Sequence, residues 1–192
     1  MHHITFLQQR YSTAAKQLGE PAPNKAELEQ ILAAAVAAPD HGGLQPWRFL
    51  IIEKEARQKL GDLMASCYQK RHPQATTELV ERQRIKPLRS PLIITVVARI
   101  QNNPSVNKME QILSAGAACQ QILLASQALG YGAIWLSGES IFDWNINEGL
   151  ELDFDDQIVG FLYLGTESEK ITAPQRPTVT DFIQHWNPSS KS

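Results

Sequence analysis

The segment from Lys108 to Leu129 constrains the fold most, because a helix over these residues has no polar face of normal width. Apolar and small residues cover most of its helical wheel: Met109, Ile112, Leu113, Ala115, Gly116, Ala117, Ala118, Cys119, Ile122, Leu123, Ala125 and Leu129. A helix that is apolar nearly all round must be buried nearly all round. In a chain of 192 residues a subunit interface is a natural place to bury it, and the small residues from Ser114 to Ala118 would let another backbone approach closely.

Apolar segments elsewhere predict the strands of a sheet. Leu92–Ala98 is rich in β-branched residues and is expected to be central. Trp47–Ile52 is apolar almost throughout, which favours a strand covered on both faces. Ile158–Gly165 and the short Ala133–Leu136 complete the set. The strands are not joined in strict βαβ alternation, and no Gly-x-Gly-x-x-Gly follows the first one, so a dinucleotide-binding Rossmann fold is disfavoured.

Helices are predicted between these strands. Asn24 and Glu27 have capping-box spacing and would start a helix that reaches about Ala38. Further helices are expected near the N-terminus up to Arg10, over Glu55–Lys70 and over Asp143–Gly149. Residues 77–89 carry four basic side chains. Such a run is usually a solvated helix face, and the alternative is contact with an anionic ligand such as a nucleotide phosphate.

Composition limits the classes of protein. Apolar residues make up 43 % and charged residues 20 %, which is typical of a globular chain, and residues 1–192 are expected to form a single domain. A formal charge of −2 gives no reason to expect a nucleic-acid partner. No apolar run approaches the roughly 20 residues of a membrane span, and the first residues do not resemble a signal peptide. We therefore expect a soluble, cytoplasmic protein, with Cys67 and Cys119 as buried thiols.

The loop from Ala37 to Phe49 holds an unusual density of special residues. Pro39 ends the preceding helix, and Gly42-Gly43 allows positive φ or a close approach to the backbone. Loops between rigid elements often carry binding groups, although a well-made helix-to-strand turn would explain the same residues. Asp40-His41 suggests a metal ligand pair, but no second pair occurs at metal spacing, so no metal site is expected.

Six segments together resemble the nitroreductase family of flavin enzymes, most closely its small single-domain bacterial members. They are Arg10-Tyr11-Ser12, residues 38–41 with 45–49, residues 91–98, Ser114-Ala115-Gly116, residues 130–135 and residues 158–166. The resemblance implies an α+β fold with a mainly antiparallel sheet between helices. It also implies a homodimer that holds two FMN molecules at its interface.

The resemblance also implies roles for named residues. Arg10 and Ser12 would grip the FMN phosphate, with the Tyr11 backbone between them, because guanidinium forks onto phosphate oxygens. His41 would lie against a flavin held mostly by the other subunit, and the amide of Gln45 would meet a ring edge. The stretch Trp135-Leu136-Ser137-Gly138 would pass beside the ring, with a backbone N–H aimed at flavin N5. No side chain need act as a catalytic acid or base, because the chemistry belongs to the cofactor.

Two positions depart from the family pattern. Close relatives carry arginine where this chain has Ala37 and Leu136. A cation for the phosphate or for the reduced flavin must then come from elsewhere. Lys170 and Arg176 are the candidates, since related enzymes use basic residues just after the last core strand.

The function implied is an oxidoreductase in which NAD(P)H reduces FMN and FMN reduces a small electron-poor acceptor such as a nitroaromatic or a quinone. The alternative is an FMN-binding protein for storage or sensing, without nicotinamide turnover. The departures at Ala37 and Leu136 keep this alternative open.

Residues 166–192 are predicted to form a C-terminal arm. Residues 177–182 have strand propensity but follow a proline-punctuated stretch with little to anchor them. An extended segment can add itself to a sheet edge through main-chain hydrogen bonds. The resemblance implies that this edge belongs to the partner, so the arms would be exchanged and would carry Lys170 and Arg176 across the interface, close to where a flavin phosphate could use them.

Overall fold

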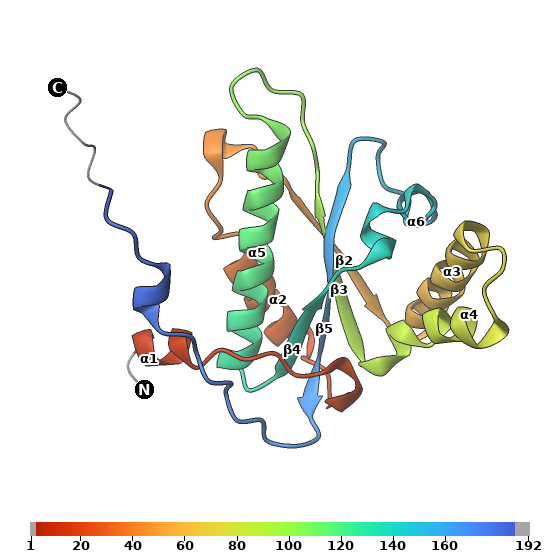
Figure 1. The fold of residues 1–192 in the computed structure, drawn as a ribbon, viewed down its shortest axis with the longest axis horizontal. Helices are drawn as coiled ribbons and strands as arrows, with labels where there is room; N and C mark the ends of the chain where they lie inside the picture. The colour runs from red at the N-terminus through yellow and green to blue at the C-terminus, as the bar shows by residue number, and fades with distance from the viewer. Residues whose placement is uncertain (1–2, 187–192) are drawn as a thin grey trace.

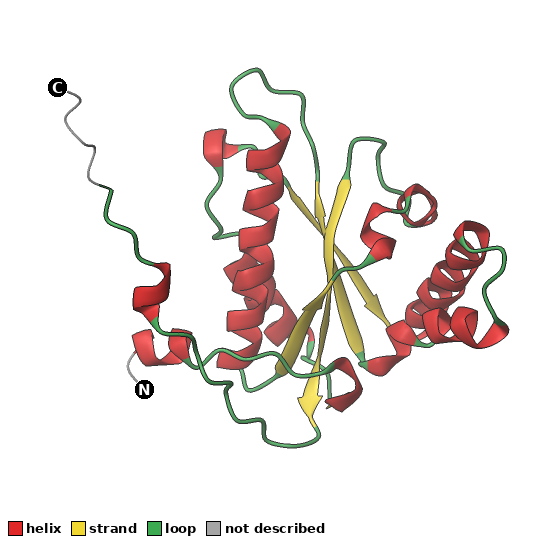
Figure 2. Cartoon of the chain, in the orientation of Figure 1, coloured by secondary structure: helices red, strands yellow, loops and turns green. Residues whose placement is uncertain are grey.

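A computed structural model describes residues 3–186 and has a single sheet with helices on both faces (Figures 1 and 2). The strands are β1 (Leu18–Gly19), β2 (Trp47–Glu53), β3 (Leu92–Ala98), β4 (Gly132–Leu136) and β5 (Gln157–Glu167). Their order is β1-β5-β3-β2, β4 also pairs with β5, and every pairing is antiparallel. The predicted α+β class with a mainly antiparallel sheet is confirmed.

The helices divide between the two faces of the sheet (Figure 1). Helices α2 (Lys25–Ala35) and α5 (Lys108–Ala128) cover one face, and α3 (Glu55–Arg71), α4 (Thr77–Arg84) and α6 (Trp144–Gly149) lie on the other side. A short α1 (His3–Gln8) precedes them, and 3-10 turns occur at η1 (Ala15–Gln17), η2 (His41–Gly43), η3 (Lys86–Arg89), η4 (Glu139–Phe142) and η5 (Val179–Phe182). None of the described helices is both long and apolar enough to span a bilayer.

Strand β3 joins two hydrophobic cores, one on each face. Leu92, Ile94 and Val96 point into the core beneath α2 and α5, while Ile93 and Val97 point into the core beneath α3 and α6. This alternation follows from the period of two in a strand. All seven residues of β3 are buried, as expected of a central strand. Both cysteines are free and buried, which confirms the prediction made for them.

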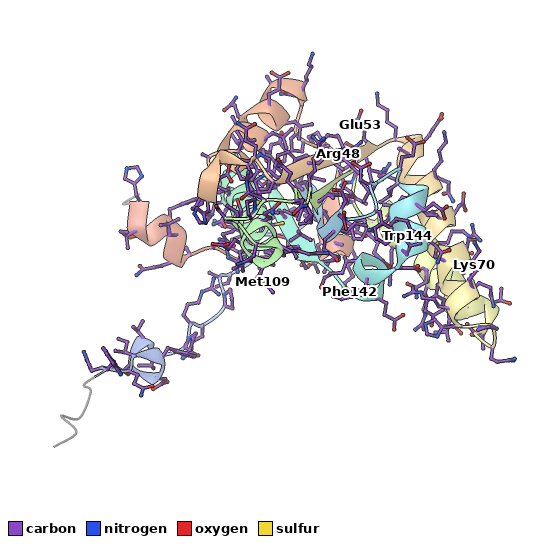
Figure 3. All side chains as sticks on the ribbon, turned by 90° about the horizontal axis from the view of Figure 1, so that it is seen from above. Arg48, Glu53, Lys70, Met109, Phe142 and Trp144 are labelled. Carbon is purple, nitrogen blue, oxygen red and sulfur yellow. The ribbon has the colours of Figure 1, made fainter. Side chains whose placement is uncertain are left out.

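Strand β2 has cover on both faces, as predicted, because Trp47 and Phe49 pack against one core and Leu50 and Ile52 against the other. It is the last strand of the sheet, and among the described residues it pairs with β3 alone. Its cover is therefore partial. Ile51 is exposed, and so are Arg48 and Glu53 (Figure 3).

Helix α5 has the predicted extent and begins with a capping box in which Asn107 and Glu110 bond each other's backbone N–H groups. Within one chain it is not buried all round. Met109 is 61 % and Leu113 64 % exposed, and Gly116 and Ala117 continue the same face half-buried. Figure 3 shows Met109 on the same side of the molecule as the exposed Phe142. The outer face of α5 therefore leaves apolar side chains that this chain alone does not cover.

The tail after β5 passes the end of α1, where Arg176 contacts Gln8 and Arg10, and then runs away from the body of the molecule (Figures 1 and 3). Within the single chain Val179–Phe182 forms the 3-10 turn η5 rather than a strand, so the predicted strand on the sheet edge of a partner stays a prediction. No sheet edge lies beside it among the described residues, and β propensity alone cannot form a strand without one. Its apolar side chains are exposed, Phe182 at 74 % and Trp186 at 84 %. Residues 187–192 of the predicted arm lie outside the described part of the chain.

Candidate flavin site

The first group of candidate residues gathers where the N-terminal segment meets the tail. An Arg10 guanidinium N–H donates to the Ser12 hydroxyl at 3.2 Å. The Arg176 guanidinium donates to the carbonyl oxygens of Arg10 and, at 3.4 Å, of Gln8. Among the described residues neither arginine forms an ion pair with a carboxylate. Two guanidinium groups and a hydroxyl therefore stand together with no protein anion to neutralise them.

Hydrogen bonds to the sheet hold this segment in place. The Tyr11 hydroxyl donates to Glu167 at 3.0 Å, and the Thr13 hydroxyl donates to the same carboxylate. The Thr13 N–H donates to the carbonyl of Ala133 at 3.1 Å. Burial, followed by the contact with Glu167, raises the pKa of Tyr11, so its phenol stays a neutral donor. The bonds fix Arg10 and Ser12 beside the start of β4.

The second group lies in the loop that follows α2. The Asp40 carboxylate accepts the N–H groups of Leu44 at 3.2 Å and Gln45 at 2.7 Å, so it closes the turn from within. Gly42 and Gly43 have φ of 76° and 65°, which glycine adopts without strain. The Nδ1 atom of His41 lies 2.9 Å from Glu110 in the first turn of α5. Ala37, His41 and Gln45 are all exposed around this turn.

Helix α5 keeps these two groups apart. His41 contacts the first turn of α5, whereas Tyr11 and residues of α1 line a hollow with Gln127 and Ala128 in its last turn. A helix of 21 residues is about 30 Å long at 1.5 Å per residue. One flavin cannot bridge that length within a single chain. Between the two ends, Pro39, His41, Glu110, Leu113, Ser114 and Ala117 line an open hollow of about 260 Å³ on the outer face of α5.

The third group, Trp135 to Gly138, ends β4 and is built around a bulge in β5. Val96 pairs with Gly160 and Val97 with Ile158, so Val159 has no partner on β3. The Trp135 indole N–H donates to the Val159 carbonyl at 3.2 Å. Leu136 is half-buried, Ser137 and Gly138 are exposed, and Gly138 has a φ of 104°. The loop therefore leaves the sheet at a fixed point with its backbone open to a ligand.

The Trp135 indole packs directly against Gly160, where no side chain occupies the space. Gly160→Ala is therefore expected to displace the indole. A Cβ at this position would lie 2.0 Å from Trp135 Nε1 and 3.2 Å from the Leu136 carbonyl oxygen. Overpacking of this kind typically costs about 1–3 kcal/mol of unfolding free energy. Urea unfolding and near-ultraviolet circular dichroism measure both effects. Gly116→Ala is the control, since its Cβ would meet the same indole at an ordinary 3.8 Å. Equal changes in stability and in the circular dichroism spectrum for both variants would show that the indole does not depend on the space at Gly160.

The bond between His41 and Glu110 predicts a pH dependence. The backbone N–H of Asn107 and then His41 hold the pKa of Glu110 below its ordinary 4.5. A depressed carboxylate pKa contributes stability that is present above the ordinary value and is lost as pH falls through the folded-state value. The melting temperature of Glu110→Gln should therefore lie below that of the wild type near neutral pH, and the two should converge under acid conditions. Glu29→Gln, at an exposed site on α2, should not reproduce this convergence.

Two hollows that the sequence did not predict flank the Ser137 side of the third group. They have volumes of about 310 Å³ and 230 Å³, and both are lined by Lys86, Ser137 and Ser140. Lys86 lies in η3, inside the basic run that sequence reasoning treated mainly as a solvated face. The buried Pro87 next to it was the available signal that this part of the run turns inward. Gly160, an isolated glycine in an apolar strand, similarly signalled the bulge.

The structure thus brings the candidate residues into three groups rather than one. Arg10, Tyr11, Ser12 and Arg176 form the first, Ala37, His41 and Gln45 the second, and Trp135, Leu136, Ser137 and Gly138 the third. Lys170, the other candidate cation, is exposed and makes no hydrogen bond or ion pair among the described residues. The first and third groups both border β4, while the second group lies at the N-terminal end of α5, away from the first.

Comparison with known proteins identifies the family of this chain. Residues 7–166 match the model of the Nitroreductase family. The chain belongs to the nitroreductase family. It is 38 % identical over 180 residues to "Putative NAD(P)H nitroreductase YdjA" of Escherichia coli K12, covering 90 % of this chain and 94 % of that protein. It is 34 % identical over 193 residues to "Putative NAD(P)H nitroreductase" of Haemophilus influenzae, covering 96 % of this chain and 100 % of that protein.

Solved structures of nitroreductase-like proteins share the fold. A nitroreductase-like family protein from Bacillus cereus superposes with a TM-score of 0.81 at 22 % identity, covering 96 % of both chains. A Desulfovibrio desulfuricans structure described as a nitroreductase in complex with FMN superposes with a TM-score of 0.71 at 23 % identity, covering 96 % of this chain and 97 % of that one. At these identities the likeness concerns the fold.

Proposed function

We propose that this member of the nitroreductase family is an FMN-dependent oxidoreductase that takes electrons from NAD(P)H and passes them to small acceptors such as nitroaromatics or quinones. The observation that carries the proposal is the pair of guanidinium groups, Arg10 and Arg176, beside the Ser12 hydroxyl and without a protein anion. Phosphate is the ligand that such a pair suits best, because its oxygens accept several charge-assisted hydrogen bonds at once. The group therefore fits the phosphate end of FMN, and Arg176 supplies a second cation in place of the arginine absent at Ala37.

The ring of FMN would lie beside residues 135–138. Trp135 is fixed by its bond to Val159, so the loop after it has a defined position. Gly138, with positive φ and no side chain, lets a flat ring approach the backbone. When bound, FMN supplies the hydride and electron transfer, while this chain holds and orients it. No side chain in the group is needed as an acid or base.

The function requires two chains. His41 contacts Glu110, whereas Tyr11 lines a hollow with Gln127, about 25 Å further along α5 at 1.5 Å per residue. His41, Gln45 and Ala37 would therefore complete the flavin site of the partner in a homodimer. The exposed apolar face of α5 supports this arrangement, because Met109 and Leu113 need cover. An interface on this face would place the hollow beside His41 against the second chain. Localisation in the cytoplasm is part of the same proposal.

Anaerobic stopped-flow reduction tests the function. Mixing the FMN-loaded protein with NADH or NADPH should bleach the flavin absorbance, and adding a nitroaromatic should restore it. Flavin that binds but is not reduced by either nicotinamide would favour the alternative, a storage or sensing protein. The observation behind that alternative is Leu136, which is apolar where relatives carry arginine. Protein that binds no FMN at all would contradict both functions.

Arg10→Ala is expected to weaken FMN binding by about 2–3 kcal/mol, the scale of a lost hydrogen bond to a charged group, or about 30- to 150-fold in Kd. The fold should remain intact, because Arg10 is only half-buried. Fluorescence titration of the apoprotein with FMN gives the Kd. Arg82→Ala removes an equally charged side chain from the surface of α4 and serves as the control. Wild-type affinity in Arg10→Ala would show that the phosphate binds elsewhere.

A further inference from the structure

The two hollows beside Ser137 adjoin each other between α3, η3 and the turn that follows β4, and they are together called the cleft. Lys86, Ser137 and Ser140 line both parts. Arg71 adds a guanidinium to the larger part, and Arg89 adds one to the smaller part. The cleft therefore opens directly beside the loop that is proposed to pass the flavin ring.

The charges in this cleft do not balance. Arg71 is neutralised, because its guanidinium lies 3.0 Å from the buried Asp143 and 3.5 Å from Glu139. The Glu139 carboxylate is also held by His72, at 3.1 Å. Lys86 and Arg89, by contrast, form no ion pair and donate no side-chain hydrogen bond among residues 3–186. The Glu139 carboxylate also lines the larger hollow and attracts Lys86. Three cations, Arg71, Lys86 and Arg89, thus stand against two carboxylates, Asp143 and Glu139, which leaves one positive charge in excess.

The surroundings of Lys86 make this imbalance costly. Burial, and then the positive charge of Arg89, lower the pKa of Lys86. Tyr163, whose pKa burial raises to about 12, remains neutral at the floor of the cleft and cannot balance the charge. An anion that entered between Lys86 and Arg89 would be held by two charge-assisted hydrogen bonds. The Ser137 and Ser140 hydroxyls would offer neutral donors next to it.

We propose that this cleft is a subsite for the anionic group of a small planar acceptor, whose carboxylate would be held by Lys86 and Arg89 next to the ring loop. The proposal rests on the proposed oxidoreductase function and names its acceptor class, carboxylated nitroaromatics or quinones. One carboxylate balances the single positive charge that remains after Asp143 and Glu139 are counted against Arg71, Lys86 and Arg89. In turnover the nitro group of such an acceptor takes up two electrons and two protons from the reduced cofactor. It is thereby reduced to a nitroso group, and one water is released.

The experiment compares 4-nitrobenzoate with the uncharged 4-nitrobenzamide on the FMN-loaded protein. Calorimetric titration gives both Kd values without turnover, and steady-state rates give both values of kcat/KM. The wild type should prefer the benzoate. Lys86→Gln should reduce that preference at least tenfold, because a hydrogen bond between charged groups is lost. Lys86→Arg should retain it, and so should Lys70→Gln, which removes an exposed lysine of α3 that lines neither hollow (Figure 3).

Two outcomes would overturn the proposal, and a third would support the subsite while contradicting the proposed function. An unchanged preference in Lys86→Gln would mean that the cleft does not bind the carboxylate. A shifted flavin reduction potential in Lys86→Gln, with the preference intact, would assign the lysine to the flavin instead. If the wild type binds the benzoate selectively but reduces neither compound, the subsite stands and the oxidoreductase function fails. The two proposals can therefore be separated.

Discussion

Ala117→Arg is expected to separate the dimer into single chains and to release FMN with it. Ala117 is half-buried on the outer face of α5 and lines the hollow beside His41 and Leu113. Within one chain an arginine here can extend into solvent, so folding should be spared. At the proposed interface its charge would be buried without a partner, at a cost of about 3–5 kcal/mol. Glu110, the acid that lines the same hollow, is already bonded by Asn107 and His41.

Sedimentation velocity and flavin absorbance measure the two effects of Ala117→Arg. A cost of this size raises the dimer Kd at least a hundredfold, since each 1.4 kcal/mol is a factor of about ten. Ser66→Arg adds the same charge to an exposed position of α3 and should leave the dimer and its FMN unchanged. A flavin-loaded Ala117→Arg dimer of normal affinity would mean that the chains associate through another surface.

Ending the chain after Ala173 should weaken the dimer and deplete it of FMN. The truncation removes Arg176, which donates to the Arg10 carbonyl, and the apolar side chains of the tail. Val179, Phe182, Ile183 and Trp186 are mostly exposed in the described chain, so they need cover that a second chain can give. Because Arg176 bonds to its own chain, any exchange of arms would begin beyond that residue.

The full-length variant Arg176→Ala separates the two contributions of the tail. It should lower FMN affinity by about 1.5–3 kcal/mol, the range for a hydrogen bond to a charged group, while the dimer Kd stays near the wild-type value. The truncated chain should show both losses. Light scattering and FMN titration on the two proteins give the comparison. A truncated chain with full dimer affinity and full flavin content would refute both the exchanged arm and the role of Arg176.

Local rules predicted most of the elements. The capping box at Asn24 starts α2 as predicted, because it depends only on residues three apart. Helix α5 starts at the predicted Lys108, and the structure adds a capping box at Asn107 that was not predicted. The central position of β3 followed from its composition. The partial exposure of β2 could not be predicted in the same way, because burial depends on which neighbours the fold supplies. The strand expected in the tail does not form within the single chain for a related reason, since a strand needs a sheet edge to pair with.

The candidate site was predictable in its residues and not in its geometry. Sequence reasoning named Arg10, Ser12 and Arg176, and these do lie together. The resemblance assigned His41 to a flavin held mostly by the other subunit, but it did not place His41 and Arg10 at opposite ends of α5, because that separation is a tertiary property. The position of Lys86 in a cleft was not predicted, because the sequence of a basic run does not distinguish side chains that face solvent from side chains that line a cleft. Charge balance within a cleft can be assessed only once the neighbours of each cation are known.

The position of strand β2 at the end of the sheet affects how the protein can associate with other molecules in solution. A strand at the end of a sheet presents free N–H and C=O groups, which invite pairing with another molecule and aggregation. Arg48 and Glu53 are both exposed on β2, and charged side chains on an edge strand disfavour its pairing with another strand (Figure 3). Neither residue belongs to any of the three groups of the candidate site. Their charges therefore help to keep this edge in solvent, independently of any chemistry that the protein performs.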